Sequence, residues 1–450
     1  MILKKIIDFY KTGPDRPLIS RDEAVIRKIY ERKRWSVFLT VTFGYGLFYV
    51  CKLSLSVVKR PMIEEGILNA DQLGDIGAAL LFTYAFGKLT NGFLADRSNI
   101  KRFMSTGLFV SAIINLLMGF NTLFWLFLIL WGINGWFQSM GSAPSVVAIT
   151  HWFSNKERGT RYGIWSIGHN IGEGLTLVGT AIIVESFGWR WGFWFSGLLC
   201  IVVATIMYFT LADRPQTYGL PPVSEYKKDY SSVPKKEGTI TEKQLLVLKN
   251  PYIWILGLSS ACMYVARYAI NNWGILYLQE EKGYSLSEAG SVIAFYPIMG
   301  AVGAILSGIV SDRFFNSRRN IPCLICGILE ITSLILFYII PPGNKLLDTM
   351  VMALFGLSLG ALLVYLGGLM AVDIASRKAA GAAMGLVGIL SYIGASVQDK
   401  VSGYLLEKNK IVIEGKVTHD FSDAFYFWIG ASILSCILAL TVWKAKPEEG

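Results

Sequence analysis

Long apolar stretches, separated by short polar turns, run through almost the whole sequence. Each stretch is long enough to cross about 30 Å of hydrocarbon at about 1.5 Å of rise per residue. The runs are continuous, whereas the strands of a membrane barrel would alternate apolar and polar positions over about ten residues. We therefore predict an all-α polytopic membrane protein with twelve transmembrane helices, at residues 35–58, 73–94, 103–120, 123–148, 160–186, 190–212, 252–278, 285–311, 321–341, 347–373, 379–405 and 423–444.

The composition agrees with a protein that lives in a bilayer. Hydrophobic residues make up 53% of the 450 residues and charged residues 16%, and the net charge is +10. Most lysines and arginines fall in the segments that a cytoplasmic N-terminus would place inside, as the positive-inside rule requires. The basic excess is thus explained by topology, and we expect membrane lipid and no nucleic acid as a partner.

The longest polar interruption divides the predicted helices into six and six. It starts with DRPQTYGLPP and is rich in proline, glycine and charged residues, which is typical of a linker. We predict an N-terminal cytoplasmic tail at 1–34, a six-helix bundle at 35–212, a cytoplasmic linker at 213–250, a second six-helix bundle at 251–444 and a C-terminal cytoplasmic tail at 445–450.

Two related motifs mark equivalent points of the two halves. GFLADRSNIKR begins at Gly92 and GIVSDRFFNSRR begins at Gly308, an offset of 216 residues. Each motif joins two predicted helices, and an acid beside arginines can bridge helix ends there. The pair resembles the loop signature of the major facilitator superfamily. This resemblance implies a major facilitator fold, in which two pseudo-symmetric six-helix bundles rock about a site at the middle of the membrane.

Each half also places one cation in its first helix. YVCK ends at Lys52 and YVAR ends at Arg267, an offset of 215 residues. A charge at bilayer depth costs at least about 2.5 to 3.5 kcal/mol, so it faces a wet cavity or a partner. Either a structural carboxylate or an anionic substrate would serve as the partner of these cations. No acid lies close to either cation in sequence, which favours a substrate phosphate or carboxylate, bound by the planar fork of Arg267 and the point charge of Lys52.

Paired cations give a physical basis for exchange. If they lie about 8 Å apart at an effective dielectric constant near 20, their repulsion is about 2 kcal/mol. An anion between them removes this repulsion. The loaded protein then closes over its substrate, whereas the empty protein closes reluctantly.

Three further polar residues are candidates for the same region. His169 lies inside the fifth predicted helix, with Trp165 one turn away on the same face; it can donate to a phosphate and gain a proton as a dianion arrives, or bond to a neighbouring helix. Lys88 lines the cavity or extends to the cytoplasmic headgroups. Glu173 would repel an anion unless it is paired or protonated, and we expect it to neutralise Lys52 or Lys88.

Tyrosines and asparagines in these helices can hydrogen-bond a polyhydroxylated substrate, although tyrosine also serves in packing and at membrane interfaces. The candidates are Tyr45, Tyr49, Tyr264, Asn271, Asn272 and Tyr392.

Four stretches extend the resemblance to a narrower family. FGYGLFYVCK, GSAPSVVAITHWFSNKERGTRYGIWSIGHNIG, CMYVARYAINNWG and KAAGAAMGLVGILSYIGAS look like the organophosphate:phosphate antiporter family. The branch that looks most similar is the bacterial hexose-phosphate branch, which contains carriers and a sugar-phosphate sensor. The resemblance runs from Tyr30 to the C-terminus. It implies exchange of a sugar phosphate, such as hexose 6-phosphate, for inorganic phosphate across the bacterial inner membrane.

The same resemblance assigns positions. Arg267, His169 and Lys88 match basic positions of the family, and Lys52 stands at the arginine of the first half. The departures are Asn272 and Tyr296, where acids are usual, and Glu173, where a glycine is usual.

Two functions fit these features. An enzyme is not expected, because the sequence has no glycine-rich phosphate loop, no HExxH and no nucleophile elbow in a soluble segment. We expect no catalytic residue, no cofactor and no metal. The leading function is antiport of sugar phosphate and phosphate by a monomer. The alternative is a membrane receptor for external sugar phosphate that signals to a partner sensor kinase.

Overall fold

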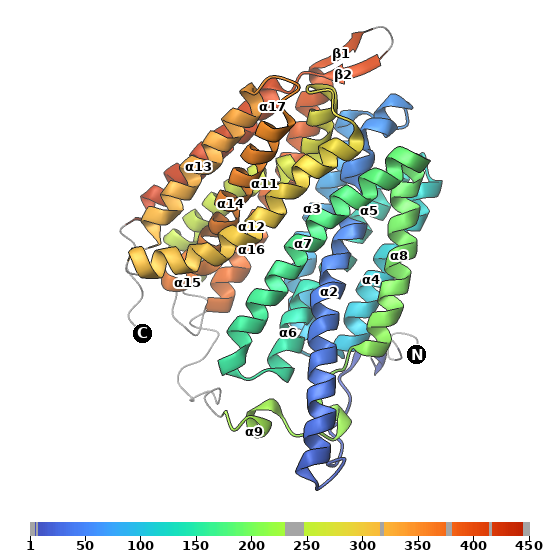
Figure 1. Cartoon of the computed structure of the whole chain (residues 1–450), viewed down its shortest axis with the longest axis vertical. Helices are drawn as coiled ribbons and strands as arrows, with labels where there is room; N and C mark the ends of the chain where they lie inside the picture. Colours follow the sequence, from blue (N-terminus) through green and yellow to red (C-terminus); the bar gives the residue numbers. More distant parts are fainter. Residues whose placement is uncertain are drawn as a thin grey trace.

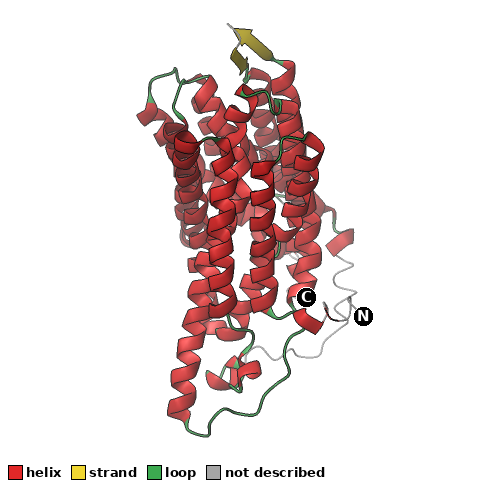
Figure 2. Ribbon diagram, turned by 90° about the vertical axis from the view of Figure 1, so that its right-hand side faces the viewer, coloured by secondary structure: helices red, strands yellow, loops and turns green. Residues whose placement is uncertain are grey.

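The structure is a computed structural model that describes residues 5, 8–229, 247–315, 319–374, 380–413 and 416–443. It is a bundle of long helices whose axes run along the long axis of the molecule (Figures 1 and 2). The predicted tail at 445–450 and residues 230–246 of the predicted linker lie outside the described residues.

The elements follow one another in chain order. They are α2 (Glu23–Glu64), α3 (Ala70–Ala95), α4 (Ile100–Phe120), α5 (Phe124–Gln138), α6 (Ser142–Trp152), α7 (Asn155–Phe187), α8 (Trp189–Thr210), the 3-10 helix η1 (Pro215–Tyr218), α9 (Val223–Tyr226), α11 (Pro251–Glu280), α12 (Leu286–Phe314), α13 (Asn320–Ile339), α14 (Lys345–Val364), the π-helical turn η2 (Tyr365–Leu369), α15 (Met370–Ile374), α16 (Ala380–Lys408), β1 (Lys410–Ile413), β2 (Lys416–His419) and α17 (Ser422–Thr441).

The helices form two groups that lie side by side. The first group, α2 to α8, occupies the right of Figure 1 and the second group, α11 to α17, the left. Three helix pairs join them: α3 packs on α16, α7 on α12, and α2 on α11. The antiparallel hairpin β1–β2 pairs Lys410 with His419 and stands at one end of the bundle, which we call the hairpin end. The start of α2 and helix α9 lie at the opposite end, which we call the terminal end (Figure 1).

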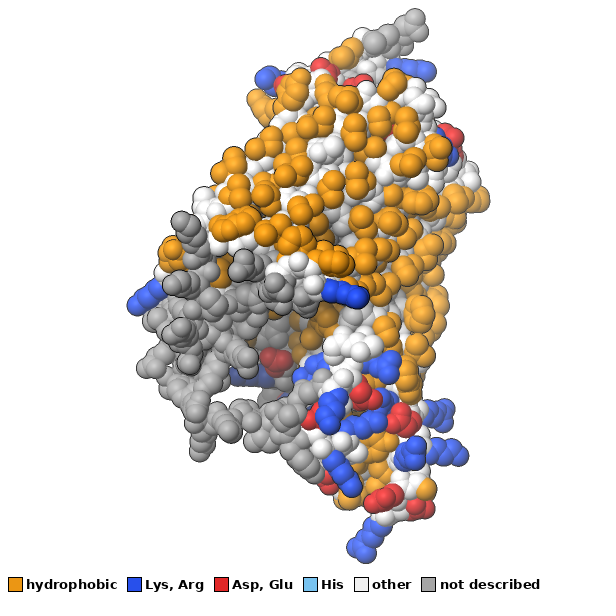
Figure 3. Space-filling view, turned by 60° about the vertical axis from the view of Figure 1, so that its left-hand side comes forward, with side chains coloured by type: hydrophobic (Ala, Val, Ile, Leu, Met, Phe, Trp, Pro, Cys, Tyr) orange, Lys and Arg blue, Asp and Glu red, His pale blue; other side chains and the backbone are white. Residues whose placement is uncertain are grey.

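Nine of the described helices are long and apolar enough to cross a membrane. They are α2, α4, α7, α8, α11, α12, α13, α14 and α17. The remaining predicted spans, 73–94, 123–148 and 379–405, coincide with α3, α5 with α6, and α16. Hydrophobic side chains cover the upper and middle parts of the surface in Figure 3, while charged side chains gather toward the terminal end. This division is typical of a protein whose middle faces lipid.

Three predicted spans differ most from the observed helices. The span 123–148 is interrupted between Gln138 and Ser142, where α5 ends and α6 begins. The span 347–373 is a helix that changes to a π-helical turn at residues 365–369 and then continues as α15. Helix α2, which contains the first predicted span, begins at Glu23, inside the predicted tail. The Asp22 side chain accepts the backbone N–H of Ala24 and caps the helix there.

Pairs of glycines set the spacing of the helices that carry the candidate residues. A Cβ atom on Gly172 of α7 would lie 2.6 Å from the carbonyl oxygen of Gly46 on α2. A Cβ atom on Gly403 of α16 would lie 2.8 Å from the Cα atom of Gly74 on α3. Only glycine allows these backbones to approach so closely, as in many membrane helix pairs. The first contact lies within one group, and the second joins the two groups toward the hairpin end.

Candidate binding site between the two helical groups

Lys52 lies in the middle of α2 inside a cage of tyrosines. Its side chain is buried, and its Nζ donates to the hydroxyl of Tyr268 on α11 at 3.1 Å. The Nζ atom is 4.5 Å from the ring centroid of Tyr84, and it also lies 5.3 Å from that of Tyr49 and 5.6 Å from that of Tyr392. Aromatic faces attract a cation, but they leave its hydrogen-bonding capacity largely unused. No carboxylate lies within ion-pair distance of Lys52 in the described part of the chain.

Arg267 of α11 is buried to the same degree but has a carboxylate beside it. Its Nη2 lies 3.6 Å from Oε2 of Glu173 on α7, so the ion pair joins the two helical groups. The other oxygen of Glu173, Oε1, accepts from Asn271 Nδ2 and from the Tyr296 hydroxyl, both at 2.7 Å. The Nε of Arg267 has no hydrogen-bond partner. Glu173 is fully buried, so water does not screen this charge.

An aromatic wall on the first group surrounds His169. Trp165, His169 and Glu173 are spaced by four residues on α7 and therefore share one face of the helix. The His169 ring lies 5.7 Å from the Tyr49 ring and 5.7 Å from the Tyr45 ring, and Tyr45 stacks on Trp165 at 5.0 Å. In the described part of the chain, neither the Nδ1 of His169 nor the Nε1 of Trp165 has a hydrogen-bond partner, although both atoms are buried. These atoms can donate to a polar ligand.

Lys88 of α3 points across the boundary between the groups. Its Nζ lies 5.2 Å from the ring centroid of Tyr392 on α16. Tyr392 in turn contacts the rings of Tyr84 at 4.6 Å and Tyr264 at 5.3 Å. Tyr84 and Lys88 are one helical turn apart on α3, which places both on the face toward α16. The sequence left two positions open for Lys88, the cavity or the cytoplasmic headgroups. In the structure its side chain faces the second helical group.

A second buried ion pair lies on the hairpin-end side of Lys52. The Nζ of Lys59 on α2 is 3.7 Å from Oδ1 of Asp399 on α16 and 3.2 Å from the ring centroid of Trp273. Asp399 accepts from Trp273 Nε1 at 2.6 Å and from Asn272 Nδ2 at 2.8 Å. A space of about 310 Å³, counted with its opening, lies between Lys52 and this pair. The pair therefore closes one side of the space next to Lys52.

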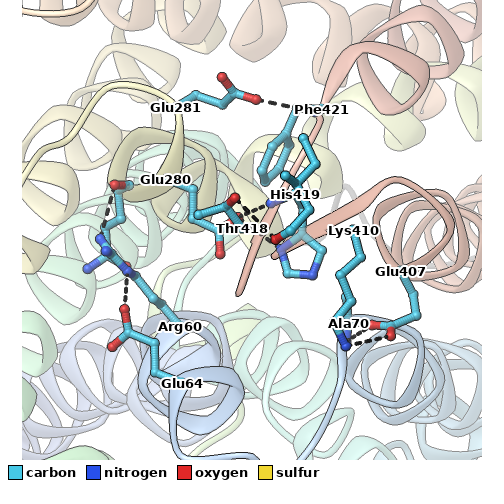
Figure 4. Close-up of polar contacts among 12 residues, drawn as sticks. Arg60, Glu64, Ala70, Glu280, Glu281, Glu407, Lys410, Thr418, His419 and Phe421 are labelled. Atoms are coloured by element: carbon cyan, nitrogen blue, oxygen red, sulfur yellow. Dashed lines mark hydrogen bonds and ion pairs between the residues drawn. The ribbon is translucent and has the colours of Figure 1, made fainter. Parts of the chain in front are cut away.

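Polar contacts continue from this pair to the hairpin end. Glu407 of α16 accepts the backbone N–H of Ala70 at the start of α3, and Arg60 of α2 donates to the carbonyl oxygen of Gln279 at 3.0 Å (Figure 4). Lys400 of α16 lies 2.9 Å from carboxylate oxygens of α3. These contacts all join the first group to the second. The two groups are thus tied together at the hairpin end.

The structure brings all ten predicted site residues into one connected region. They are Tyr45, Tyr49, Lys52, Lys88, Trp165, His169, Tyr264, Arg267, Asn271 and Tyr392, contributed by α2, α3, α7, α11 and α16. The expectation for Glu173 is wrong in its partner: Glu173 pairs with Arg267 rather than with Lys52 or Lys88. Arg267 also has the structural carboxylate that sequence proximity disfavoured, because α7 packs on α12 and thereby brings Glu173 within reach of the Arg267 side chain. Asn272 donates to Asp399 and also lines the space between Lys52 and the Lys59–Asp399 pair.

Sequence reasoning missed several residues of this region. Tyr84 and Tyr268 complete the cage around Lys52. Tyr296, noted in the sequence only as a departure from the family pattern, donates to Glu173. Tyr84 and Tyr268 could have been predicted from the sequence. Tyr84 lies one helical turn from Lys88, and Tyr268 lies one turn from Tyr264, so each shares a helix face with a predicted site residue. Lys59 and Asp399 carry no such signal, because 340 residues separate them in the sequence.

Comparisons with known proteins identify relatives over almost the full length. The chain is 34% identical over 450 residues to the membrane sensor protein UhpC of Escherichia coli (strain K12), covering 99% of this chain and 100% of that protein. It is 33% identical over 458 residues to the glycerol-3-phosphate transporter of Bacillus subtilis (98% of each). It is 32% identical over 445 residues to a probable hexose phosphate transport protein of Chlamydia muridarum (95% of each).

The structural comparison agrees in fold. A bacterial homologue of the human lysosomal transporter Spinster, solved in an inward-facing and unoccupied conformation, matches with a TM-score of 0.71 at 18% identity, covering 92% of this chain and 97% of that one. The profile of the Major Facilitator Superfamily matches residues 35–398. The chain is a multi-pass membrane protein, and its relatives are transporters and a sensor, not enzymes. It belongs to the Major Facilitator Superfamily, within the branch of the organophosphate:phosphate antiporters.

Proposed function

We propose that this chain is a secondary transporter that exchanges a sugar phosphate, such as hexose 6-phosphate, for inorganic phosphate by alternating access. The observation that carries the proposal is the buried, caged Lys52, which has no carboxylate counter-ion among the described residues and lies at the boundary between the two groups. An unscreened cation at bilayer depth is costly and calls for an anionic partner. The relatives named as glycerol-3-phosphate and hexose phosphate transporters support a phosphate ester as that partner.

The neighbouring side chains have roles that follow from their donors. Lys52 and Arg267 hold the phosphoryl group, one from each helical group, while Lys88 and His169 add charge and a hydrogen bond. Tyrosines 45, 49, 264 and 392, with Trp165 and Asn271, bind the sugar through hydroxyl hydrogen bonds and ring contacts.

The contacts at the hairpin end define the state of the transporter. Because Lys59 with Asp399 and the bonds beyond them tie the groups together there, we assign this state to a carrier closed on the hairpin side. Opening that side requires the buried Lys59–Asp399 pair to separate. Bound substrate lowers this cost by drawing the two groups together around the site, as alternating access demands.

The topology follows from the distribution of charge. Lysines and arginines gather toward the terminal end (Figure 3). By the positive-inside rule, this end is cytoplasmic, with both termini, in a bacterial inner membrane. We propose twelve spans in two domains, 35–212 and 251–444, acting as a monomer.

One assay tests the exchange. Purified protein in liposomes loaded with inorganic phosphate should take up labelled hexose 6-phosphate, and phosphate-free liposomes should not. Lys52→Gln should lose this uptake, whereas Lys28→Gln, at an exposed position on the same helix, should keep it. Equal uptake into loaded and phosphate-free liposomes would exclude the exchange.

The similarity to a membrane sensor protein favours one second function. A receptor would bind external sugar phosphate with the same residues and pass the change of state to a partner sensor kinase. It would bind the ester tightly and show negligible counterflow in the same liposomes. The ratio of binding to counterflow therefore separates the two functions.

A further inference from the structure

Glu173 puts a buried negative charge into a site that the proposed function gives to an anion. We propose that Glu173 binds a proton together with the phosphate-bearing substrate and releases that proton when the substrate leaves. This inference rests on the proposed function and adds a second ligand, the proton, to the same site.

The two oxygens of Glu173 have different surroundings. Oε1 accepts from Asn271 and from Tyr296, each at 2.7 Å, so both of its donors are already in place. Oε2 is buried and has no hydrogen-bond partner among the described residues, and Nη2 of Arg267 lies 3.6 Å from it. A proton on Oε1 would clash with two existing donors. Oε2 is therefore the atom that can take a proton without breaking a hydrogen bond.

Arg267 cannot serve the carboxylate and a phosphate equally well. Its guanidinium binds anions with paired N–H donors, and Glu173 approaches the same group from α7. A phosphoryl group beside Arg267 would also be repelled by the ionised carboxylate, and no water screens this repulsion because Glu173 is fully buried. A proton on Oε2 removes the negative charge and leaves the bonds to Oε1 intact. It also frees the guanidinium for the substrate.

Apart from Arg267, the titratable groups around Glu173 do not supply a positive charge that is free to compensate the carboxylate. From α2, Tyr49 and Lys52 lie within electrostatic range, and Tyr268 of α11 and Tyr296 of α12 complete the surroundings. Of these only Lys52 is cationic, and it bonds to Tyr268. On α7 itself, His169 lies one turn away and is the alternative proton acceptor. The experiment must therefore distinguish Glu173 from His169.

The cycle balances in protons. A proton binds Oε2 of ionised Glu173, the guanidinium of Arg267 leaves the carboxylate, and phosphoryl oxygens take its place. On release, the anion leaves, Oε2 loses the proton, and Arg267 returns to Glu173. An ester moving one way and phosphate moving the other each travel with one proton, so exchange itself needs no proton gradient. The affinity for either ligand depends on pH, because binding is linked to proton uptake.

The test compares dissociation constants across pH. Inorganic phosphate and hexose 6-phosphate are titrated into the full-length protein in nanodiscs between about pH 6 and pH 8. The wild-type Kd should rise relative to that of Glu173→Gln by about tenfold per pH unit, as expected for one linked proton. The titration of the ligand itself affects both proteins and cancels in this ratio. Glu330→Gln, another buried carboxyl position on α13, is the matched control and should follow the wild type.

The outcomes separate this inference from the proposed function. A ratio of Kd values that stays constant with pH overturns proton binding by Glu173, even if liposome exchange succeeds. A pH dependence lost in His169→Gln and kept in Glu173→Gln also overturns it. A wild type that binds neither phosphate nor ester at any pH overturns the proposed function, and this inference with it.

A second measurement covers the case in which Glu173→Gln does not fold. Infrared difference spectra of the wild type on adding phosphate should show the carbonyl stretch of a newly protonated carboxyl group. The same band should persist in Glu330→Gln. A spectrum without the band overturns the inference.

Discussion

The two cations at corresponding positions of the two helical groups have opposite surroundings. Lys52 of the first group lies among tyrosine rings and donates to one tyrosine hydroxyl. Arg267 of the second group lies beside the carboxylate of Glu173. Both side chains are almost fully buried, with exposed fractions of 7% and 6%. The repeat in the sequence thus conceals a difference in how each charge is compensated.

This difference assigns distinct tasks to the two residues. An aromatic face offsets only part of the cost of burying a charge, about 2 kcal/mol or somewhat more for a desolvated cation. Lys52 is therefore the charge that most needs an anion in this state. Arg267 already has a counter-ion in Glu173. In the proposed cycle, Lys52 therefore attracts the phosphoryl group, and Arg267 exchanges Glu173 for it.

The largest effect is expected at Lys52. Lys52→Gln removes the cation without a counter-ion and should weaken binding of inorganic phosphate by about 4 to 5 kcal/mol, as for a desolvated charge partner. Equilibrium binding in nanodiscs measures this loss. Lys52→Arg keeps the charge and should retain most of the affinity. If the glutamine variant binds phosphate as well as the wild type does, Lys52 does not contact the anion and the comparison fails.

A smaller loss of binding is expected at Arg267. Because part of its charge is already compensated by Glu173, Arg267→Gln should weaken phosphate binding by about 2 to 3 kcal/mol. The same change leaves a buried carboxylate without its cation, which should lower the free energy of unfolding by about 3 kcal/mol. Thermal unfolding of the purified protein checks the second effect.

A double variant sharpens the assignment. Arg267→Gln with Glu173→Gln removes both charges and should recover most of the lost stability, while phosphate binding stays weak. Recovery of binding together with stability would mean that Arg267 acts only as a structural partner of Glu173.

Sequence patterns predicted much of the fold and part of the site, for identifiable reasons. Apolar runs and the glycine-acid-arginine repeat indicate local helices and internal symmetry, which is why each predicted span overlaps a described helix, although 123–148 is two helices and 347–373 includes a π-helical turn. Lys52, His169 and Arg267 were identifiable from the sequence because a polar residue in an apolar helix stands out. The partner of Arg267 was not, since Glu173 and Arg267 meet only through the packing of α7 against the second group. The Lys59–Asp399 pair was not predicted for the same reason, because its two residues lie on distant segments that meet only through helix packing.

The smallest effect is expected in the cage itself. Among the tyrosine rings of the cage, that of Tyr84 is nearest to Lys52, with its centroid 4.5 Å from Nζ. Tyr84→Leu keeps an apolar side chain but removes the ring quadrupole that stabilises the charge of Lys52 when no anion is bound, a contribution of about 1 kcal/mol. Because the empty state loses this contribution and the anion-bound state loses less, the variant should bind phosphate slightly tighter, by about fivefold at most. Tyr404→Leu, at an exposed position on α16, is the control and should leave the Kd unchanged. A large loss of affinity in Tyr84→Leu would contradict the difference drawn here, because it would mean that the ring binds the substrate rather than compensating Lys52.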